Sequence, residues 1–132
     1  MKYLFDTHAW IWWMAQPEAV SPTVKSLLAN PEQYEGMLLS AVSVWEFGLL
    51  LREGRLALSC AAEDWVEKAL EMPGLKLAPL TPQIAYRATQ LPGSPPPDQI
   101  DQLLIATARE ENAVIITKDP AIAAYRHVRT VW

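Results

Sequence analysis

The sequence predicts an α/β protein built on a mainly parallel sheet. Apolar runs typical of buried strands alternate with segments of helical periodicity, an order that favours parallel strands joined by crossover helices. The clearest strand is the β-branched run over residues 114–117, and the first apolar run, Tyr3-Leu4-Phe5, is similar. An acid follows each run, so we expect carboxylates at the edge of the sheet where parallel strands end.

Composition places the chain among globular proteins. Its 132 residues suit one domain, and 51% hydrophobic with 20% charged residues exclude a disordered chain. The single cysteine, Cys60, excludes an intrachain disulfide and a cysteine-based metal site. The N-terminus resembles neither a signal peptide nor a membrane span, so we expect a cytoplasmic protein with no membrane partner. A net charge of −4 disfavours a general nucleic-acid coat, but not a polyanion bound through divalent cations.

In the first half of the chain, capping residues and prolines mark the ends of the elements. We expect a strand over residues 2–7 and a helix over 9–15, which Pro17 ends. Ser21-Pro22 is typical of a helix start and predicts a short helix over 23–29. The other elements are a strand over 36–40, a helix capped by Ser43 and ended by Gly54, and an amphipathic helix over 63–71 with Trp65, Val66, Ala69 and Leu70 inward.

The second half continues the alternation. A turn at Pro73-Gly74 precedes a strand over 75–80 and a helix that Thr81 caps and that runs to about Leu91. After the rigid loop 92–97, Asp98 and Asp101 resemble a capping box that opens a helix to Glu111. The remaining elements are a C-cap at Asn112, the strand over 114–117, a helix over 120–125 and a short strand over 128–132.

The first helix is apolar nearly all round. Trp10, Trp13 and Met14 share one face, which favours core positions for Trp10 and Trp13. Trp12 falls on another face and predicts a contact with a partner, in which we also include Trp13. With Trp45 and Phe47, this helix would suit a hydrophobic groove for the helix of an inhibitor protein.

Acidic residues recur where strands end and helices begin. Asp6 and Asp119 follow strands, while Glu46 and the pair Asp98/Asp101 lie in first turns of helices. Each alone fits a helix cap or a solvated charge equally well, but together they would converge at one edge of a parallel sheet. Carboxylates about 5 Å apart would repel by roughly 3 kcal/mol per pair at a dielectric of 20, which bound Mg²⁺ or Mn²⁺ would offset. Such a site supports phosphodiester hydrolysis without a nucleophilic side chain.

Four blocks of sequence, over residues 4–8, 43–46, 98–108 and 116–119, resemble the signature blocks of the PIN domain, in the family's order. The resemblance runs from Met1 to about Tyr125 and is strongest to the VapC-type toxins of toxin–antitoxin pairs. It implies one PIN-like domain over residues 1–132 with an α/β/α sandwich fold. It also implies a Mg²⁺- or Mn²⁺-dependent endoribonuclease that hydrolyses RNA, forms a homodimer and is silenced by a cognate antitoxin.

The resemblance assigns roles to individual residues. The catalytic, metal-binding acids of the family fall on Asp6, Glu46, Asp101 and Asp119. Asp98 corresponds to an additional acid that binds metal directly or through water. Thr117 matches a hydroxyl residue that supports the site, and Thr7 stands beside Asp6 as a second supporting residue. His8 is structural or faces the substrate, since the resemblance does not make it a ligand.

Other interpretations remain open from the sequence. A phosphatase of the haloacid dehalogenase type would need a second Asp where this chain has His8, and no glycine-rich loop supports nucleotide binding. A catalytically inactive module that only binds a partner is the main alternative, and the complete acid set argues against it. The chain lacks basic residues that relatives often carry at Leu50, Gln102 and before Asp98. Basic residues that could meet phosphates, unranked by the sequence, are Arg52, Arg55, Lys118 and Arg126.

Overall fold

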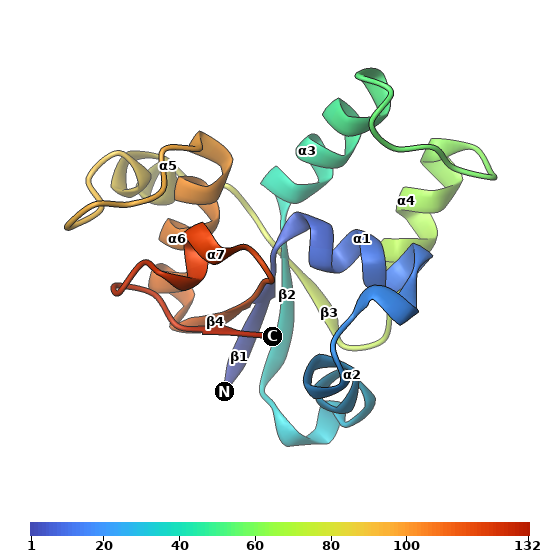
Figure 1. Cartoon of the computed structure of the whole chain (residues 1–132), viewed down its shortest axis with the longest axis horizontal. Coiled ribbons are helices and arrows are strands. Elements are labelled where there is room, and N and C mark those ends of the chain that lie inside the picture. Colours follow the sequence, from blue (N-terminus) through green and yellow to red (C-terminus); the bar gives the residue numbers. More distant parts are fainter.

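The computed structural model describes residues 1–132 and contains one sheet of five parallel strands (Figure 1). The strand order is β3-β2-β1-β4-β5, with β1 at the centre. All four pairings are parallel, which confirms the predicted parallel sheet. The strands are β1 (Lys2–Phe5), β2 (Gly36–Ser40), β3 (Leu75–Ala78), β4 (Ala113–Ile116) and β5 (Thr130–Val131).

Helices connect the strands and lie on both faces of the sheet. They are α1 (Thr7–Ala15), α2 (Pro22–Ala29), α3 (Ala41–Arg52), α4 (Ala62–Leu70), α5 (Pro82–Ala88), α6 (Gln99–Glu111) and α7 (Pro120–Ala123), with 3₁₀ turns at Pro17–Ala19 and Pro31–Gln33. Ser21 and Thr81 cap α2 and α5 through their side chains, as expected. Asn112 ends α6 in the left-handed conformation, with φ at 52°. No helix is long and apolar enough to cross a membrane.

Alternation of side chains along the strands divides the core into two layers. Phe5 and Ile116 pack with α1 to α4 on one face, whereas Leu4 and Ile115 pack with α6 and α7 on the other. Figure 1 shows α1, α2 and α4 on one side of the sheet and α5, α6 and α7 on the other. The molecule is therefore the expected three-layer α/β/α sandwich.

The connectivity places a topological switch between β1 and β4. The chain moves outward from β1 through β2 to β3, then returns through α6 to β4 on the opposite side of β1. Ligands of open α/β sheets bind in the crevice at such a switch, beyond the carboxyl ends of the strands. Asp6 directly follows β1, and its amide donates to the carbonyl of Ile116 at 3.0 Å.

Two predictions about α3 and α4 are wrong. Ser40, not Ser43, caps α3, because β2 ends at Ser40 and its hydroxyl accepts from the Val42 amide at 3.0 Å. Ser43 is instead buried inside the helix. Leu70 is 39% exposed, whereas the preceding Ala69 is fully buried. Successive residues of a helix are about 100° apart, so both cannot face the core.

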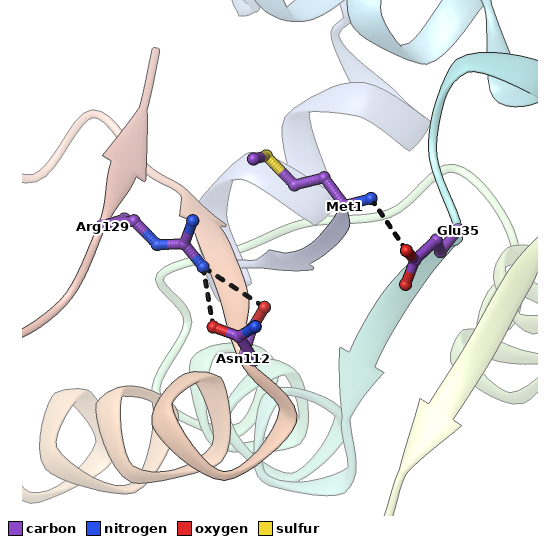
Figure 2. Close-up of polar contacts among 4 residues, drawn as sticks. All are labelled: Met1, Glu35, Asn112 and Arg129. Carbon is purple, nitrogen blue, oxygen red and sulfur yellow. Dashed lines mark hydrogen bonds and ion pairs between the residues drawn. The ribbon is translucent and has the colours of Figure 1, made fainter.

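Polar contacts fasten the opposite edge of the sheet, where the strands begin. The terminal ammonium of Met1 pairs with Glu35 at 3.4 Å, which links the start of β1 to the segment before β2. Arg129 donates to the side-chain oxygen of Asn112 at 3.0 Å and to its carbonyl at 3.4 Å (Figure 2). These contacts tie the segment before β5 to the end of α6 and leave the carboxyl edge free.

Candidate active site

A cleft of about 530 Å³ opens at the carboxyl edge of the sheet. All five acids singled out in the sequence line it, so the structure brings the predicted set together. They come from four distant parts of the chain, which meet because the strands are parallel and their carboxyl ends lie at one edge of the sheet. The lining residues are Asp6, His8, Ala9, Trp12, Glu46, Arg55, Asp98, Asp101, Lys118, Asp119 and Pro120.

Asp6 occupies the N-cap position of α1 but does not cap it. Its side chain makes no capping hydrogen bond, and Oδ2 accepts from the Thr117 hydroxyl at 2.7 Å. The residue is only 8% exposed. Burial raises the pKa of this carboxyl, an effect that the Thr117 bond partly opposes. A structural cap does not account for Asp6.

Thr117 connects two of the acids. Its hydroxyl donates to Asp6 and accepts from the amide of Asp119 at 3.0 Å, so it fixes the carboxylate of one and the backbone of the other. The side chain is 2% exposed, which protects both bonds from water. This geometry suits the supporting role expected for Thr117.

Replacing Thr117 with Val is expected to weaken divalent-metal affinity by about 10- to 100-fold, because the change removes both bonds while keeping the side-chain shape. Titration calorimetry with Mn²⁺ measures the effect, with Thr130→Val in β5 as the matched control. Unchanged affinity in Thr117→Val, with an intact circular-dichroism spectrum, would contradict a supporting role.

Asp98 and Asp119 cap helices and line the cleft at the same time. Asp98 Oδ1 accepts from the Asp101 amide at 2.9 Å, and Asp119 Oδ1 accepts from the Ala121 amide at 2.9 Å. Each carboxylate uses one oxygen for its cap. Capping a helix and lining the cleft are therefore compatible for these two residues. The capping bond fixes the position of each carboxylate at the rim of the cleft.

Asp101 lies where the negative charge concentrates. Its pKa is raised to about 7, first by burial and then by the charges of the other acids, of which Asp98 contributes most, followed by Asp6, Asp119 and Glu46. Burial also raises the pKa of Glu46, with contributions from Asp6 and Asp98. The other four acids thus all raise the pKa of Asp101, as expected for carboxylates that line one cleft with it.

Thr7 holds two helices together at the site. It is fully buried, and its hydroxyl donates to the Ser43 hydroxyl at 2.9 Å, joining the first turn of α1 to the first turn of α3. Glu46 lies one turn further along α3. The bond therefore fixes the helix that carries Glu46, which fits the expected supporting role of Thr7.

The donor set fits a hard divalent cation. The acids offer only oxygen ligands, and none of them takes part in an ion pair with a basic side chain. As they stand, no three of these side chains are grouped tightly enough to hold an ion, so binding requires side-chain rotation. A bound divalent cation would offset the negative charge of the cleft carboxylates, which no basic side chain pairs with.

The structure ranks the basic residues that the sequence left equal. Arg55, in the loop after α3, and Lys118, after β4, line the acidic cleft, and so does the exposed His8. Arg52 does not line it, and Arg126 borders a separate cavity of about 350 Å³ near the end of α6. No sequence signal marks this difference, because it depends on where the loop after α3 folds.

An apolar cavity of about 680 Å³ adjoins the acidic cleft. It differs from the predicted groove. Phe47 is buried and stacks on Trp65 with ring centroids 4.5 Å apart, while Trp45 is 60% exposed and lies outside it. Trp10 is fully buried as expected, and the partly buried Trp13 packs against the core. The apolar lining is Ile11, Trp12, Met14, Ala15, Leu50, Leu56, Ala57, Leu58 and Trp65.

A parallel α/β/α sandwich with carboxylates gathered at its switch point is the architecture that the sequence blocks predict for a PIN domain. The sequence pattern of the PIN domain matches residues 3–128. The chain therefore belongs to the PIN domain family. Ribonucleases of this family generally use a divalent metal ion.

Individual relatives agree with this assignment. Ribonuclease VapC22 of Mycobacterium tuberculosis is 30% identical over 131 residues, which cover 98% of this chain and 97% of that protein. VapBC2 of Rickettsia felis, solved bound to a DNA fragment from its promoter, is similar with a TM-score of 0.72 and 13% identity, covering 99% and 98% of the two chains. VapC20 of M. tuberculosis, a toxin that cleaves the Sarcin-Ricin loop, gives a TM-score of 0.60 and 18% identity, covering 96% and 98%.

Proposed function

We propose that this chain is a metal-dependent endoribonuclease, the toxin of a toxin–antitoxin pair. The observation that carries the proposal is the convergence of five carboxylates, without cationic partners, in one cleft at the switch point of the sheet. The relative at 30% identity is named a ribonuclease, and it matches this chain over nearly its full length.

The acids would hold Mg²⁺ or Mn²⁺. Asp6, Glu46, Asp101 and Asp119 are the proposed direct ligands, and Asp98 binds directly or through water. When bound, a divalent ion activates water and offsets the charge on the phosphate and the leaving oxygen. Thr117 orients Asp6, and Thr7 fixes the helix that carries Glu46.

The cleft contains no hydroxyl or thiol side chain. No Ser, Thr, Cys or Tyr lines it, and Cys60 is exposed and lies outside. The carboxylate set, which suits a divalent ion that activates water, supports direct attack by water on the phosphodiester. The oxygen-only ligand set selects hard ions such as Mg²⁺ and Mn²⁺ over softer ones.

The apolar cavity beside the acidic cleft would receive the antitoxin. His8, Trp12 and Arg55 line both spaces, so an amphipathic antitoxin helix seated on the apolar lining would reach the catalytic cleft. In this arrangement Trp12 contacts the antitoxin, and Trp13 packs α1 against the hydrophobic core. We also expect a homodimer, which light scattering of the purified chain measures.

The test is RNA cleavage by the chain purified without a partner. Single-stranded and structured RNA are incubated with Mg²⁺ or Mn²⁺, with EDTA, and with an Asp6→Asn variant as the control for contaminating nucleases. Cleavage that requires metal and is lost in the variant supports the proposal. Equal activity in both preparations contradicts it, and absence of both cleavage and metal binding would favour the inactive, partner-binding alternative.

A further inference from the structure

Lys118 is the one lysine that lines the acidic cleft, and it does not pair with the acids there. It stands between Thr117 and Asp119, directly after β4, with an exposed side chain. A lysine beside several carboxylates ordinarily forms an ion pair with one of them. Lys118 takes part in none of the ion pairs of the structure.

The ammonium of Lys118 instead lies over the indole of Trp12, with Nζ 5.9 Å from the ring centroid. The face of an indole attracts a cation through its quadrupole, and tryptophan is the side chain that does so best. The indole ring has no oxygen that could accept a hydrogen bond from the ammonium. The three donors of the ammonium stay free for another partner.

Trp12 is itself held in place. Its ring lies 5.9 Å from that of Trp132 in an edge-to-face arrangement and 5.9 Å from the His8 ring, and the side chain packs against the core. A lysine on a flexible stem gains a defined position by resting on such a fixed ring. The indole therefore places a positive charge at the rim of the cleft.

This placement separates two charges that would otherwise neutralise each other. The carboxylates remain available for a divalent ion, and the ammonium remains available for an anion that enters the same cleft. Arg55 is the other basic residue with a long side chain in the lining. Its Nη1 lies 3.7 Å from Oε2 of Glu53, so part of its positive charge is already compensated. Lys118 is thus the cation best placed to meet a phosphate.

We propose that Lys118 contacts the phosphate backbone of the RNA in the cleft, and that Trp12 is the positioning residue that holds its ammonium there. The inference rests on the proposed ribonuclease function. It assigns Trp12 a role in the toxin's own activity, through Lys118, and not through direct stacking on a base of the RNA.

The first test measures kcat/KM for a single-stranded oligoribonucleotide. Lys118→Met is expected to lower kcat/KM by about 10- to 100-fold, because it removes a charged contact to phosphate. Lys118→Arg should stay within about threefold of the wild type, since the guanidinium keeps the charge and can also lie over the indole. The slope of log kcat/KM against log salt should become shallower by about 0.7 in Lys118→Met. Lys25→Met, on the exposed face of α2, is the matched control.

A double-mutant cycle tests Trp12. Trp12→Leu is expected to lower kcat/KM with Lys118 present, but to have little further effect in Lys118→Met, because its role acts through that lysine. Equal losses from Trp12→Leu in both backgrounds would overturn the positioning role and point to direct contact with RNA. Retention of wild-type kcat/KM by folded Lys118→Met would overturn the phosphate contact while leaving the ribonuclease intact. Failure of the wild type itself to cleave RNA would overturn the proposed function, and this inference with it.

Discussion

The Asp6→Asn variant is expected to lose at least about 1,000-fold in kcat/KM for RNA cleavage, since metal ions supply several kcal/mol of transition-state stabilisation. Asp6 is the buried acid of the cleft, and its carboxylate is already aimed by the Thr117 hydroxyl. An asparagine keeps the volume and can accept the same hydrogen bond through its amide oxygen. The substitution therefore removes the charge with little change in packing.

The control for this loss is Asp64→Asn, an exposed acid in the first turn of α4 that lies outside the cleft. It should retain wild-type activity within about twofold, as expected for surface substitutions. Activity is measured with Mn²⁺ in excess, and melting curves verify that both variants fold. Substantial metal-dependent cleavage by folded Asp6→Asn would exclude Asp6 from the metal site.

The Asp101→Asn variant is expected to lose activity and yet gain stability when no metal is present. The pKa of Asp101 is raised from 3.8 to about 7, mainly by burial and then by the neighbouring acids. In metal-free protein the folded state therefore binds more protons than the unfolded state between these values. Linkage then requires stability to fall as the pH rises from about 4 through 7. Asparagine removes this contribution.

The measurement is the melting temperature in EDTA between pH 5 and pH 8.5. At pH 8, Asp101→Asn should melt about 3–6 °C above the wild type, for a gain of roughly 1 kcal/mol after solvent screening. The difference should shrink towards pH 5, where the wild-type carboxyl is protonated. Mn²⁺ should stabilise the wild type more than the variant. If Asp101→Asn were no more stable than the wild type at pH 8, the ionised Asp101 would not destabilise the metal-free fold.

Most of the fold could be predicted because the strands are continuous apolar runs bounded by caps and prolines. The exact helix boundaries were harder to predict. Ser40 and Ser43 are both good N-caps, and only the end of β2 decides between them, which depends on pairing with β1 and β3. Similarly, α5 ends at Ala88, whereas the sequence offers no strong break before Pro92.

The acids of the site could be predicted because a parallel sheet brings strand ends and helix starts to one edge. Their separate roles could not be. Asp6 and Asp119 both occupy N-cap positions, but only Asp119 uses its side chain as a cap, because Thr117 competes for Asp6. That competition joins residues 111 positions apart, which no local pattern reveals.

The basic and aromatic surroundings of the acids depend on side-chain direction. Arg52 and Arg55 are close in sequence, yet only Arg55 reaches the cleft, because the chain turns at the end of α3. Trp12 is one position from the partly buried Trp13 but lines both the apolar cavity and the acidic cleft. Helical periodicity assigned it an exposed face without showing what lies opposite.

The most direct test of the central claim is the anomalous diffraction of Mn²⁺ in crystals of the chain. We expect a peak in the acidic cleft within coordination distance of carboxylate oxygens from Asp6, Asp101 and Asp119, and its loss in Asp6→Asn. A peak confined to other parts of the surface, or no peak at an Mn²⁺ concentration that supports RNA cleavage, would contradict a carboxylate-bound metal site in this fold.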